Sequence, residues 1–284
     1  MRTVVIGDIG GHFTVLTRIL DQLVVSGDRL PANVQVIQVG DLVRAGERFR
    51  ESNTAIMSRM QSILQRNPNW IQLLGNPNWI QLLGNHECAA LGGPAKGNWD
   101  VEASFDEECR SILRSLWDSG RIRLAASERG ALITHAGLTH GHWSVLGSPA
   151  AAEAACDMLN RGVGQQMADI CRPGRLVTDA VTADADILWA EVNTELLAPW
   201  LAGQDMPFDQ IHGHASPFRW NTGQWWADAS AKVRQATQAD VTLRRSQTQI
   251  QGTQRTLTSV DWVLEDIEPE CLWPLLTLPG GKTW

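Results

Sequence analysis

Short apolar runs rich in β-branched residues alternate with helical patterns along most of the chain. The runs occupy residues 3–7, 34–40, 79–84, 131–137 and 210–213, and each ends at a glycine. Apolar residues recur at helical spacing over about 12–25, 52–64, 103–117 and 149–160, and a further apolar stretch lies near 186–201. Alternating strands and helices predict a protein of the α/β class.

The texture of the sequence changes beyond Trp226. Residues 238–265 alternate polar residues with apolar or β-branched ones, with Gly252 as the expected hairpin turn and Trp262 and Val263 on the far strand. This pattern predicts antiparallel β structure. No Ser/Pro-rich linker precedes it. We therefore expect one domain over 1–284, with residues 218–284 completing it as antiparallel β structure and a C-terminal tail.

One segment is duplicated. The nonapeptide NPNWIQLLG occupies residues 67–75 and again 76–84. Two copies of nine residues do not make a solenoid, which needs at least three units of roughly 20–50 residues. Only the second copy runs into Asn85-His86-Glu87. We therefore expect the second copy to form the central strand and the first to form a protruding loop.

Charge and composition exclude several classes of protein. The 284 residues carry 24 Lys+Arg against 31 Asp+Glu, a net charge of −7, which argues against nucleic-acid binding through a basic surface. The sequence has neither an apolar run long enough to cross a membrane nor the layout of a signal peptide at MRTVVIGD. Its five cysteines include no CxxC pair. These features predict reduced thiols, no membrane association and a cytoplasmic location; they do not predict the oligomeric state.

Polar side chains follow the predicted strands at the point where each one ends. They are Asp8, Asp41, Asn85, His135 and His214. Each one alone is compatible with a cap or a core hydrogen bond at a strand end. Because ligands bind at the carboxyl ends of strands in α/β sheets, their joint occurrence predicts a metal site. Carboxylate, amide and imidazole groups suit divalent transition metals.

Five motifs around these residues resemble those of the calcineurin-like metallophosphoesterases in order and spacing. They are GDIGGH (7–12), GDLVRAG (40–46), GNHE (84–87), THAG (134–137) and GHAS (213–216). Within that superfamily the sequence is most similar to bacterial phosphoprotein-phosphatase-type members, which are serine/threonine phosphatase-like. The resemblance spans residues 1 to about 217. It implies a four-layer α/β/β/α sandwich with two divalent metal ions, for which manganese, iron, zinc and nickel are the candidates.

The resemblance also implies a role for each residue. Asp8 would bind metal 1, and Asp41 would bridge both metals. Metal 2 would be completed by Asn85, His135 and His214. His86 would lie beside the phosphate as the general acid or as an electrostatic partner, and Asn85 would also contact the substrate.

The sequence departs from the family pattern at four positions. Gly10 replaces a histidine of the first motif, and Arg44 and Ala45 replace an aspartate and an arginine of the second. The last motif ends in Ser216 where many members have a second histidine. Metal 1 therefore keeps fewer ligands than metal 2. His12 is a candidate additional ligand, and Arg44 is a candidate phosphate contact because a guanidinium suits bidentate phosphate binding.

Two functions follow from these residues. The first is a phosphatase, a hydrolase in which metal-activated hydroxide attacks a phosphomonoester or phosphodiester and His86 assists the leaving oxygen. The alternative is a degenerate member of the family that binds a phosphorylated ligand or partner without turnover. A phosphorylated small molecule, a nucleotide or a phosphoprotein would fit either. Trp220, Trp225 and Trp226 are candidates to line a substrate groove, although aromatic residues are more often part of the core.

Overall fold

The computed structural model describes most of the chain. The described residues are 2–23, 25–67, 78–93, 95, 99–166, 187–203, 206–241, 244–250, 252–260 and 276–278.

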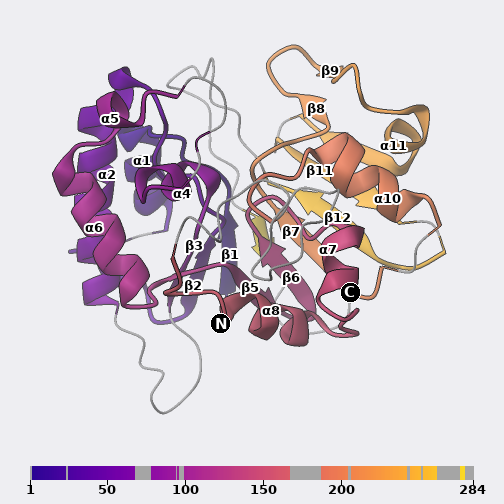
Figure 1. Cartoon of the computed structure of the whole chain (residues 1–284), viewed down its shortest axis with the longest axis horizontal. Helices are drawn as coiled ribbons and strands as arrows, with labels where there is room; N and C mark the ends of the chain where they lie inside the picture. The colour runs from indigo at the N-terminus through magenta and orange to yellow at the C-terminus, as the bar shows by residue number, and fades with distance from the viewer. Residues whose placement is uncertain are drawn as a thin grey trace.

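Two β-sheets pack face to face between two layers of helices (Figure 1). The first sheet has the order β13 (Leu276–Leu278), β1 (Arg2–Ile6), β2 (Val34–Gln38), β3 (Trp79–Leu82) and β4 (Ile122–Arg123). Strands β1 to β4 are parallel, and β13 is antiparallel to β1. Parallel strands need crossover connections, which the helices between them supply.

The second sheet is mixed. Its order is β10 (Thr237–Asp240), β11 (Arg245–Gln249), β12 (Thr256–Ser259), β7 (Asp209–His212), β6 (Ala131–Thr134) and β5 (Ala125–Glu128). The pairs β12–β7 and β7–β6 are parallel, and the other pairs are antiparallel. Strands β8 (Phe218–Arg219) and β9 (Gln224–Trp225) form a separate hairpin.

Helices cover the outer face of each sheet (Figure 1). On the side of the first sheet lie α1 (Phe13–Gln22), η1 (Glu47–Phe49), α2 (Arg50–Arg66), α4 (Asn85–Ala90), α5 (Val101–Ser104) and α6 (Glu107–Asp118). On the side of the second lie α7 (His140–Val145), α8 (Ala152–Asn160), the π-helix η2 (Val192–Leu197), α10 (Ala198–Leu201) and α11 (Ala231–Ala236).

The period of two along each strand explains the four layers. In β1, Val4 and Ile6 pack in the same cluster as α1, whereas Val5 faces the second sheet. The layer between the sheets also contains Ile37, Val39, Ile80, Leu82, Ala126, Ala131, Ile133, Ile211 and Val260. The predicted α/β/β/α sandwich is therefore confirmed.

Most predicted elements lie where the sequence pattern places them, and the second copy of the nonapeptide forms β3 as predicted. The predicted helix over 103–117 is interrupted, because Asp106 caps a new helix by accepting the backbone N–H of Cys109 at 2.8 Å. The first copy of the nonapeptide, apart from Asn67, lies outside the described residues. So do Trp262 and Val263.

The C-terminal strands β10, β11 and β12 are antiparallel, as the alternating pattern predicts, and β12 then joins the second sheet beside β7. The single-domain interpretation of 1–284 stays a prediction. No described helix is both long and apolar enough to cross a membrane.

The cysteines correct one expectation. Cys109 and Cys156 are buried free thiols, as predicted. Cys88 is disulfide-bonded, so the expectation of reduced thiols is wrong for this cysteine. Cys88 follows directly after His86-Glu87 and is buried.

We expect the stability of the fold to be most sensitive to the truncation of side chains that are buried between the two sheets. Ile37 is fully buried there, so Ile37→Ala should lower the free energy of unfolding by about 2–5 kcal/mol and Ile37→Val by about 0.5–1.5 kcal/mol. The exposed Val241 is the control, and Val241→Ala should change stability by less than about 0.5 kcal/mol. Urea denaturation measures all three. An Ile37→Ala protein as stable as Val241→Ala would contradict this description of the core.

Candidate metal centre

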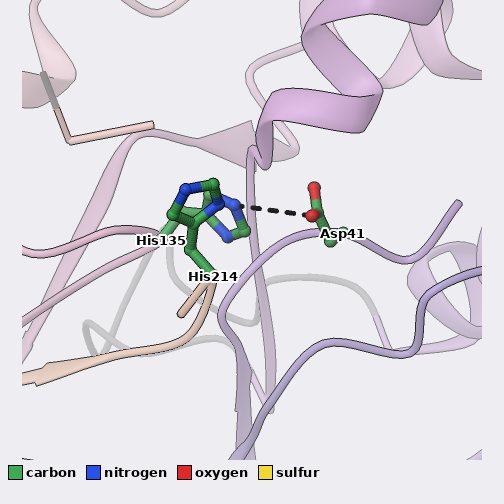
Figure 2. Close-up of side chains that lie close together, drawn as sticks. All are labelled: Asp41, His135 and His214. Carbon is green, nitrogen blue, oxygen red and sulfur yellow. Dashed lines mark ion pairs between the residues drawn. The ribbon is translucent and has the colours of Figure 1, made fainter. Parts of the chain in front are cut away.

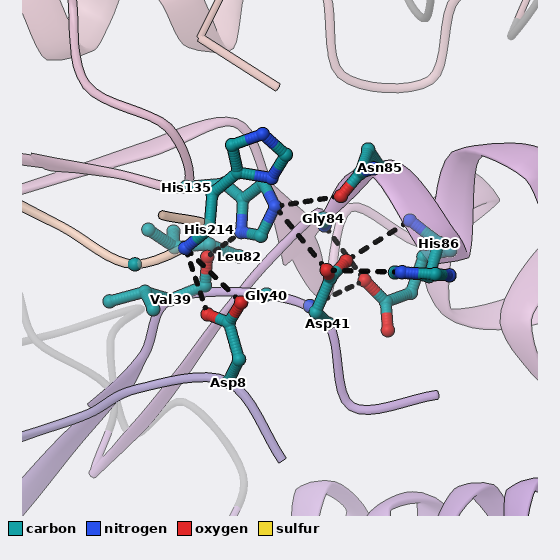
Figure 3. Close-up of polar contacts among 12 residues, drawn as sticks. Asp8, Val39, Gly40, Asp41, Leu82, Gly84, Asn85, His86, His135 and His214 are labelled. Atoms are coloured by element: carbon teal, nitrogen blue, oxygen red, sulfur yellow. Dashed lines mark hydrogen bonds and ion pairs between the residues drawn. The ribbon is translucent and has the colours of Figure 1, made fainter. Parts of the chain in front are cut away.

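The loops that follow five parallel strands bring polar side chains to one place between the two sheets. Asp8 follows β1, Asp41 follows β2 and Asn85 follows β3, all in the first sheet. His135 follows β6 and His214 follows β7 in the second sheet. Figure 3 shows these side chains directed toward one another. The structure therefore brings together all five residues that the strand ends predict.

Asp41, His135 and His214 form the centre of this group (Figure 2). One ligand atom from each lies within 4.8 Å of the others, as expected for three groups around one cation. Nδ1 of the buried His135 donates to the carbonyl oxygen of Val39 at 3.1 Å, so Nε2 carries no proton and keeps a free lone pair. This Nε2 lies 3.6 Å from Asp41 Oδ2. A metal-binding histidine commonly uses its second nitrogen in this way. The three residues present therefore fit a divalent metal.

Asn85 lies against the same cluster. Its side chain reaches Nε2 of His135 at 3.0 Å. In the amide orientation that satisfies its hydrogen bonds, the nitrogen donates to the two carboxylate oxygens of Asp41 at 3.2 and 3.0 Å. With the amide turned over, the same side chain presents an oxygen to the centre. Asn85 is therefore placed where the prediction needs a ligand, and its role stays a prediction.

Asp8 contacts the backbone of the second sheet. Its two carboxylate oxygens accept the backbone N–H of His214 at 3.2 and 3.1 Å. This close approach depends on Gly213, because a Cβ atom there would lie 2.3 Å from Asp8 Oδ1. His214 itself adopts a positive φ of 61°. Asp8 thus fixes the loop that carries His214, and its predicted role as a ligand of metal 1 stays a prediction.

Glu87 holds the two loops of the first sheet together. Its buried carboxylate accepts the backbone N–H groups of Asp41 at 2.8 Å, Val43 at 3.0 Å and Gly84 at 2.8 Å. Burial raises the pKa of Glu87, and these N–H groups act against that rise. The strand-end pattern of the sequence does not single out Glu87. Its signal is a glutamate three residues after a helix N-cap, the second half of a capping box.

The loops around Asp41 and Asn85 approach each other too closely for a larger residue at position 84. A Cβ atom on Gly84 would lie 2.3 Å from the backbone nitrogen of Asp41. Asp41 itself adopts a positive φ of 52°, and the backbone N–H of His86 donates to its Oδ1 at 3.0 Å. The position of Asp41 is therefore fixed at its backbone, which packs against Gly84, and at its carboxylate, which the His86 N–H contacts.

His86 lies beside this cluster as a neutral imidazole. Its Nδ1 accepts the backbone N–H of Ala45 at 3.0 Å, which places the proton on Nε2, 3.7 Å from Asp41 Oδ2. Trp99 stacks on the ring, with centroids 4.2 Å apart and planes inclined by 13°. Burial, followed by the charges of Arg44 and His214, lowers the pKa of His86 to about 3. A backbone N–H thus fixes both the orientation and the tautomer of His86.

Arg44 and His12 lie on the first-sheet side of the centre. Asn53 fixes the backbone of Arg44, accepting its N–H at 3.0 Å and donating to its carbonyl at 2.9 Å. The guanidinium of Arg44 lies 5.3 Å from the centre of the Phe49 ring, and its charge contributes to lowering the pKa of both His86 and His12. The ring of His12 packs edge-on against Phe49 at 5.3 Å. Phosphate binding by Arg44 and metal binding by His12 stay predictions.

The comparisons with known proteins agree with this geometry. The model of the calcineurin-like phosphoesterases matches residues 1–244. A search of curated proteins finds no match. The structure is similar to that of a cold-active protein tyrosine phosphatase, with 14% identity, a TM-score of 0.54 and coverage of 98% of this chain and 73% of that one.

Two further solved structures are more distant. One is the cold-active protein-tyrosine phosphatase of a psychrophilic Shewanella species, with 16% identity, a TM-score of 0.45 and coverage of 82% and 72%. The other is a metallophosphoesterase from Sphaerobacter thermophilus, with 18% identity, a TM-score of 0.26 and coverage of 48% and 47%.

The geometry predicts unequal metal binding. Asp41, His135 and His214 converge, whereas Asp8 already accepts a backbone N–H. Calorimetric titration of the metal-free protein with Mn²⁺ should show one tight and one weaker site, because fewer protein ligands bind a metal less tightly. His135→Ala should abolish the tight site, and His12→Asn should leave it intact. Two sites of equal affinity would contradict this prediction.

Glu87 should affect stability and metal affinity together. Glu87→Gln keeps the volume but turns an amide NH₂ toward backbone N–H groups, so at least one buried donor loses its acceptor. We expect the free energy of unfolding to fall by about 1–3 kcal/mol. We also expect weaker Mn²⁺ binding, because the Asp41 loop loses a constraint. Glu153→Gln, at an exposed position of α8, is the control. Unchanged Mn²⁺ affinity in Glu87→Gln would show that the loop keeps its place without this carboxylate.

Proposed function

The chain belongs to the calcineurin-like phosphoesterase family, and on that premise we propose that it hydrolyses a phosphoester with a divalent metal held by Asp41, His135 and His214. The observation that carries the proposal is the convergence of these three side chains from different sheets. A bound divalent ion would polarise the phosphoryl oxygens and lower the pKa of a water molecule. Asn85 and Asp8 are the proposed further ligands, with Asp8 at the second and weaker site.

The protein's own residues prepare the centre for this ion. The Val39 carbonyl keeps the proton of His135 on Nδ1, so that Nε2 remains a ligand atom. The backbone N–H of His86 and the carboxylate of Glu87 orient Asp41 through its side chain and its backbone. These contacts fix the positions of the ligand atoms before a metal binds, which reduces the reorganisation that binding requires.

His86 would act as a neutral hydrogen-bond donor. Its Nε2 proton faces the centre, while the N–H of Ala45 occupies Nδ1 and disfavours a second proton there. In the proposed reaction the Nε2–H donates to an oxygen of the phosphoester and stabilises the charge that develops on it. Of the two roles that the sequence suggested for His86, general acid and electrostatic partner, we therefore propose the second. Arg44 is the proposed contact to a phosphoryl oxygen.

The alternative is a protein that binds a phosphorylated ligand without turnover. The departures at Gly10, Arg44 and Ala45 motivate it, and the preformed cluster with His86 beside it favours hydrolysis. Assays of p-nitrophenyl phosphate and bis(p-nitrophenyl) phosphate, with Mn²⁺, Fe²⁺, Zn²⁺ or Ni²⁺, distinguish the two functions and separate mono- from diesterase activity. Turnover that is lost in His135→Ala supports hydrolysis. A protein that binds metal but turns over neither ester with any of these metals supports the alternative. Nucleotides, small phosphoesters and phosphoproteins remain the proposed substrate classes, and the cytoplasm the proposed location.

His86 should influence turnover without influencing the fold. We expect His86→Asn to lower kcat by about 10²–10³-fold, the range for the loss of one hydrogen-bond donor to a developing negative charge. Metal content and melting temperature should stay near those of the unmodified protein, because Asp41, His135 and His214 are unchanged. His140→Asn on α7, outside the converging cluster, is the matched control and should keep full activity.

The pH dependence tests the protonation state of His86. Since its pKa is lowered to about 3, the imidazole is neutral throughout the range from pH 5 to 8 and does not titrate there. The ratio of kcat between the unmodified protein and His86→Asn should therefore be constant across this range. A ratio that changes about an apparent pKa near 6.5 would show that His86 acts as an imidazolium.

A further inference from the structure

A cavity of about 390 Å³ opens beside the metal centre on the side of the second sheet. Its walls include Asn193, His214, Ser216, Arg219, Trp226 and Asp228. Because His214 belongs both to the cavity wall and to the converging cluster, a phosphoester held at the centre has this cavity next to it. The cavity is therefore placed to receive the organic group of the ester.

One aromatic residue forms a wall of this cavity. Of the three tryptophans that the sequence suggested for a groove, Trp220 is buried and Trp225 packs edge-on against Phe218 at 5.3 Å. Trp226 lines the cavity and is 37% exposed. The guanidinium of Arg219 lies 3.9 Å from the centre of the Trp226 ring, so this charge is directed at the aromatic face.

Other residues of the wall offer hydrogen-bond acceptors. Asn193 is 3% exposed, and its Nδ2 donates to Asp228 Oδ1 at 2.8 Å. Its own Oδ1 has no hydrogen-bond partner among the described residues. A buried carbonyl oxygen without a donor is costly, and Asn193 lies in a π-helix, a geometry frequent at functional sites. Asn193 therefore leaves an acceptor unused in this wall, and Nε of Arg219 is an unused donor of the same wall among the described residues.

The charges of the residues that line the cavity also favour a cationic group on the substrate. Glu191 and Asp228 supply two carboxylates against the one guanidinium of Arg219, so the lining carries more negative than positive side-chain charge. A second anionic group on the substrate would meet this excess of negative charge, whereas a protonated nitrogen would find acceptors. Hydrogen bonds to charged groups are the strong ones.

We propose that this cavity binds the organic group of the phosphoester substrate, and that this group carries an ammonium or guanidinium, which donates to Asp228 and Asn193. The inference rests on the proposed function and names the chemistry of its substrate. Two sources carry this chemistry: a small amino-alcohol phosphate, and a phosphorylated peptide with a basic side chain beside the phosphoresidue.

The first test compares small phosphomonoesters of similar size on the Mn²⁺-loaded protein. They are O-phosphoethanolamine with a cationic group, glycerol 1-phosphate with a neutral group and 3-phosphoglycerate with an anionic group. We expect kcat/KM to be about tenfold higher for the cationic than for the neutral ester, and lowest for the anionic one. In Asp228→Asn the ratio of kcat/KM for the cationic ester to that for the neutral ester should fall to about one. Asp157→Asn, which removes the same charge from an exposed position of α8, should keep the preference.

A second arm distinguishes the two sources. A phosphoserine peptide with a neighbouring arginine is compared with the same peptide carrying alanine instead. A preference for the arginine peptide that exceeds the preference for O-phosphoethanolamine, and that is lost in Asp228→Asn, identifies a peptide as the source. A preference confined to O-phosphoethanolamine identifies the small molecule.

Turnover of p-nitrophenyl phosphate reports on the proposed function separately. If there is none, calorimetric titration of O-phosphoethanolamine and glycerol 1-phosphate into the Mn²⁺-loaded protein measures the same preference as a ratio of Kd values. The proposal is overturned if the unmodified protein, Asp228→Asn and Asp157→Asn share one ratio, or if the anionic ester is preferred.

Discussion

The geometry of the candidate metal centre depends on the hydrogen bonds that the carboxylate of Glu87 accepts. This carboxylate is buried at the N-terminal end of α4 and accepts three backbone N–H groups, two from the loop after β2 and one from the loop after β3. A buried carboxylate is tolerated only where hydrogen bonds replace its hydration, so the two loops must keep the geometry that supplies them. This constraint holds Asp41 in a left-handed backbone conformation that is unusual for a residue with a side chain.

A second constraint joins the two sheets at the site. The apolar layer with Val5, Ile37 and Ile133 fixes the sheets against each other, and the bond from the His214 backbone to Asp8 crosses between them at the site itself. Asp41, Asn85 and His86 follow strands of the first sheet, whereas His135 and His214 follow strands of the second sheet. The glycines at 84 and 213 allow this convergence, because side chains there would occupy the space of Asp41 and Asp8.

Much of this arrangement could be predicted from the sequence, because the strands are short apolar runs and the ends of parallel strands meet at one edge of a sheet. The chemistry of Asn85-His86 also identified which copy of the nonapeptide forms β3. Two features depend on contacts between distant residues and have no clear local signal. They are the bonds from the Asp41 and Val43 backbone to Glu87, and the N–H of Ala45 that fixes the tautomer of His86. The break before α6 did have a signal, since Asp106 is a good N-cap, but the continuous apolar pattern hid it.

The residues proposed for catalysis and those proposed for substrate selection lie in different halves of the chain. The residues proposed to act on the phosphoryl group lie on the side of the first sheet, His86 in the first turn of α4 and Arg44 in the segment after β2. The cavity proposed to select the organic group is built from the π-helix and from residues after β7 in the second half of the chain. Only His214 belongs to both the converging cluster and the cavity wall. Substitutions in the wall can therefore change which ester is bound while the loops held by Glu87 keep their geometry, since no hydrogen bond described for Glu87 reaches the cavity.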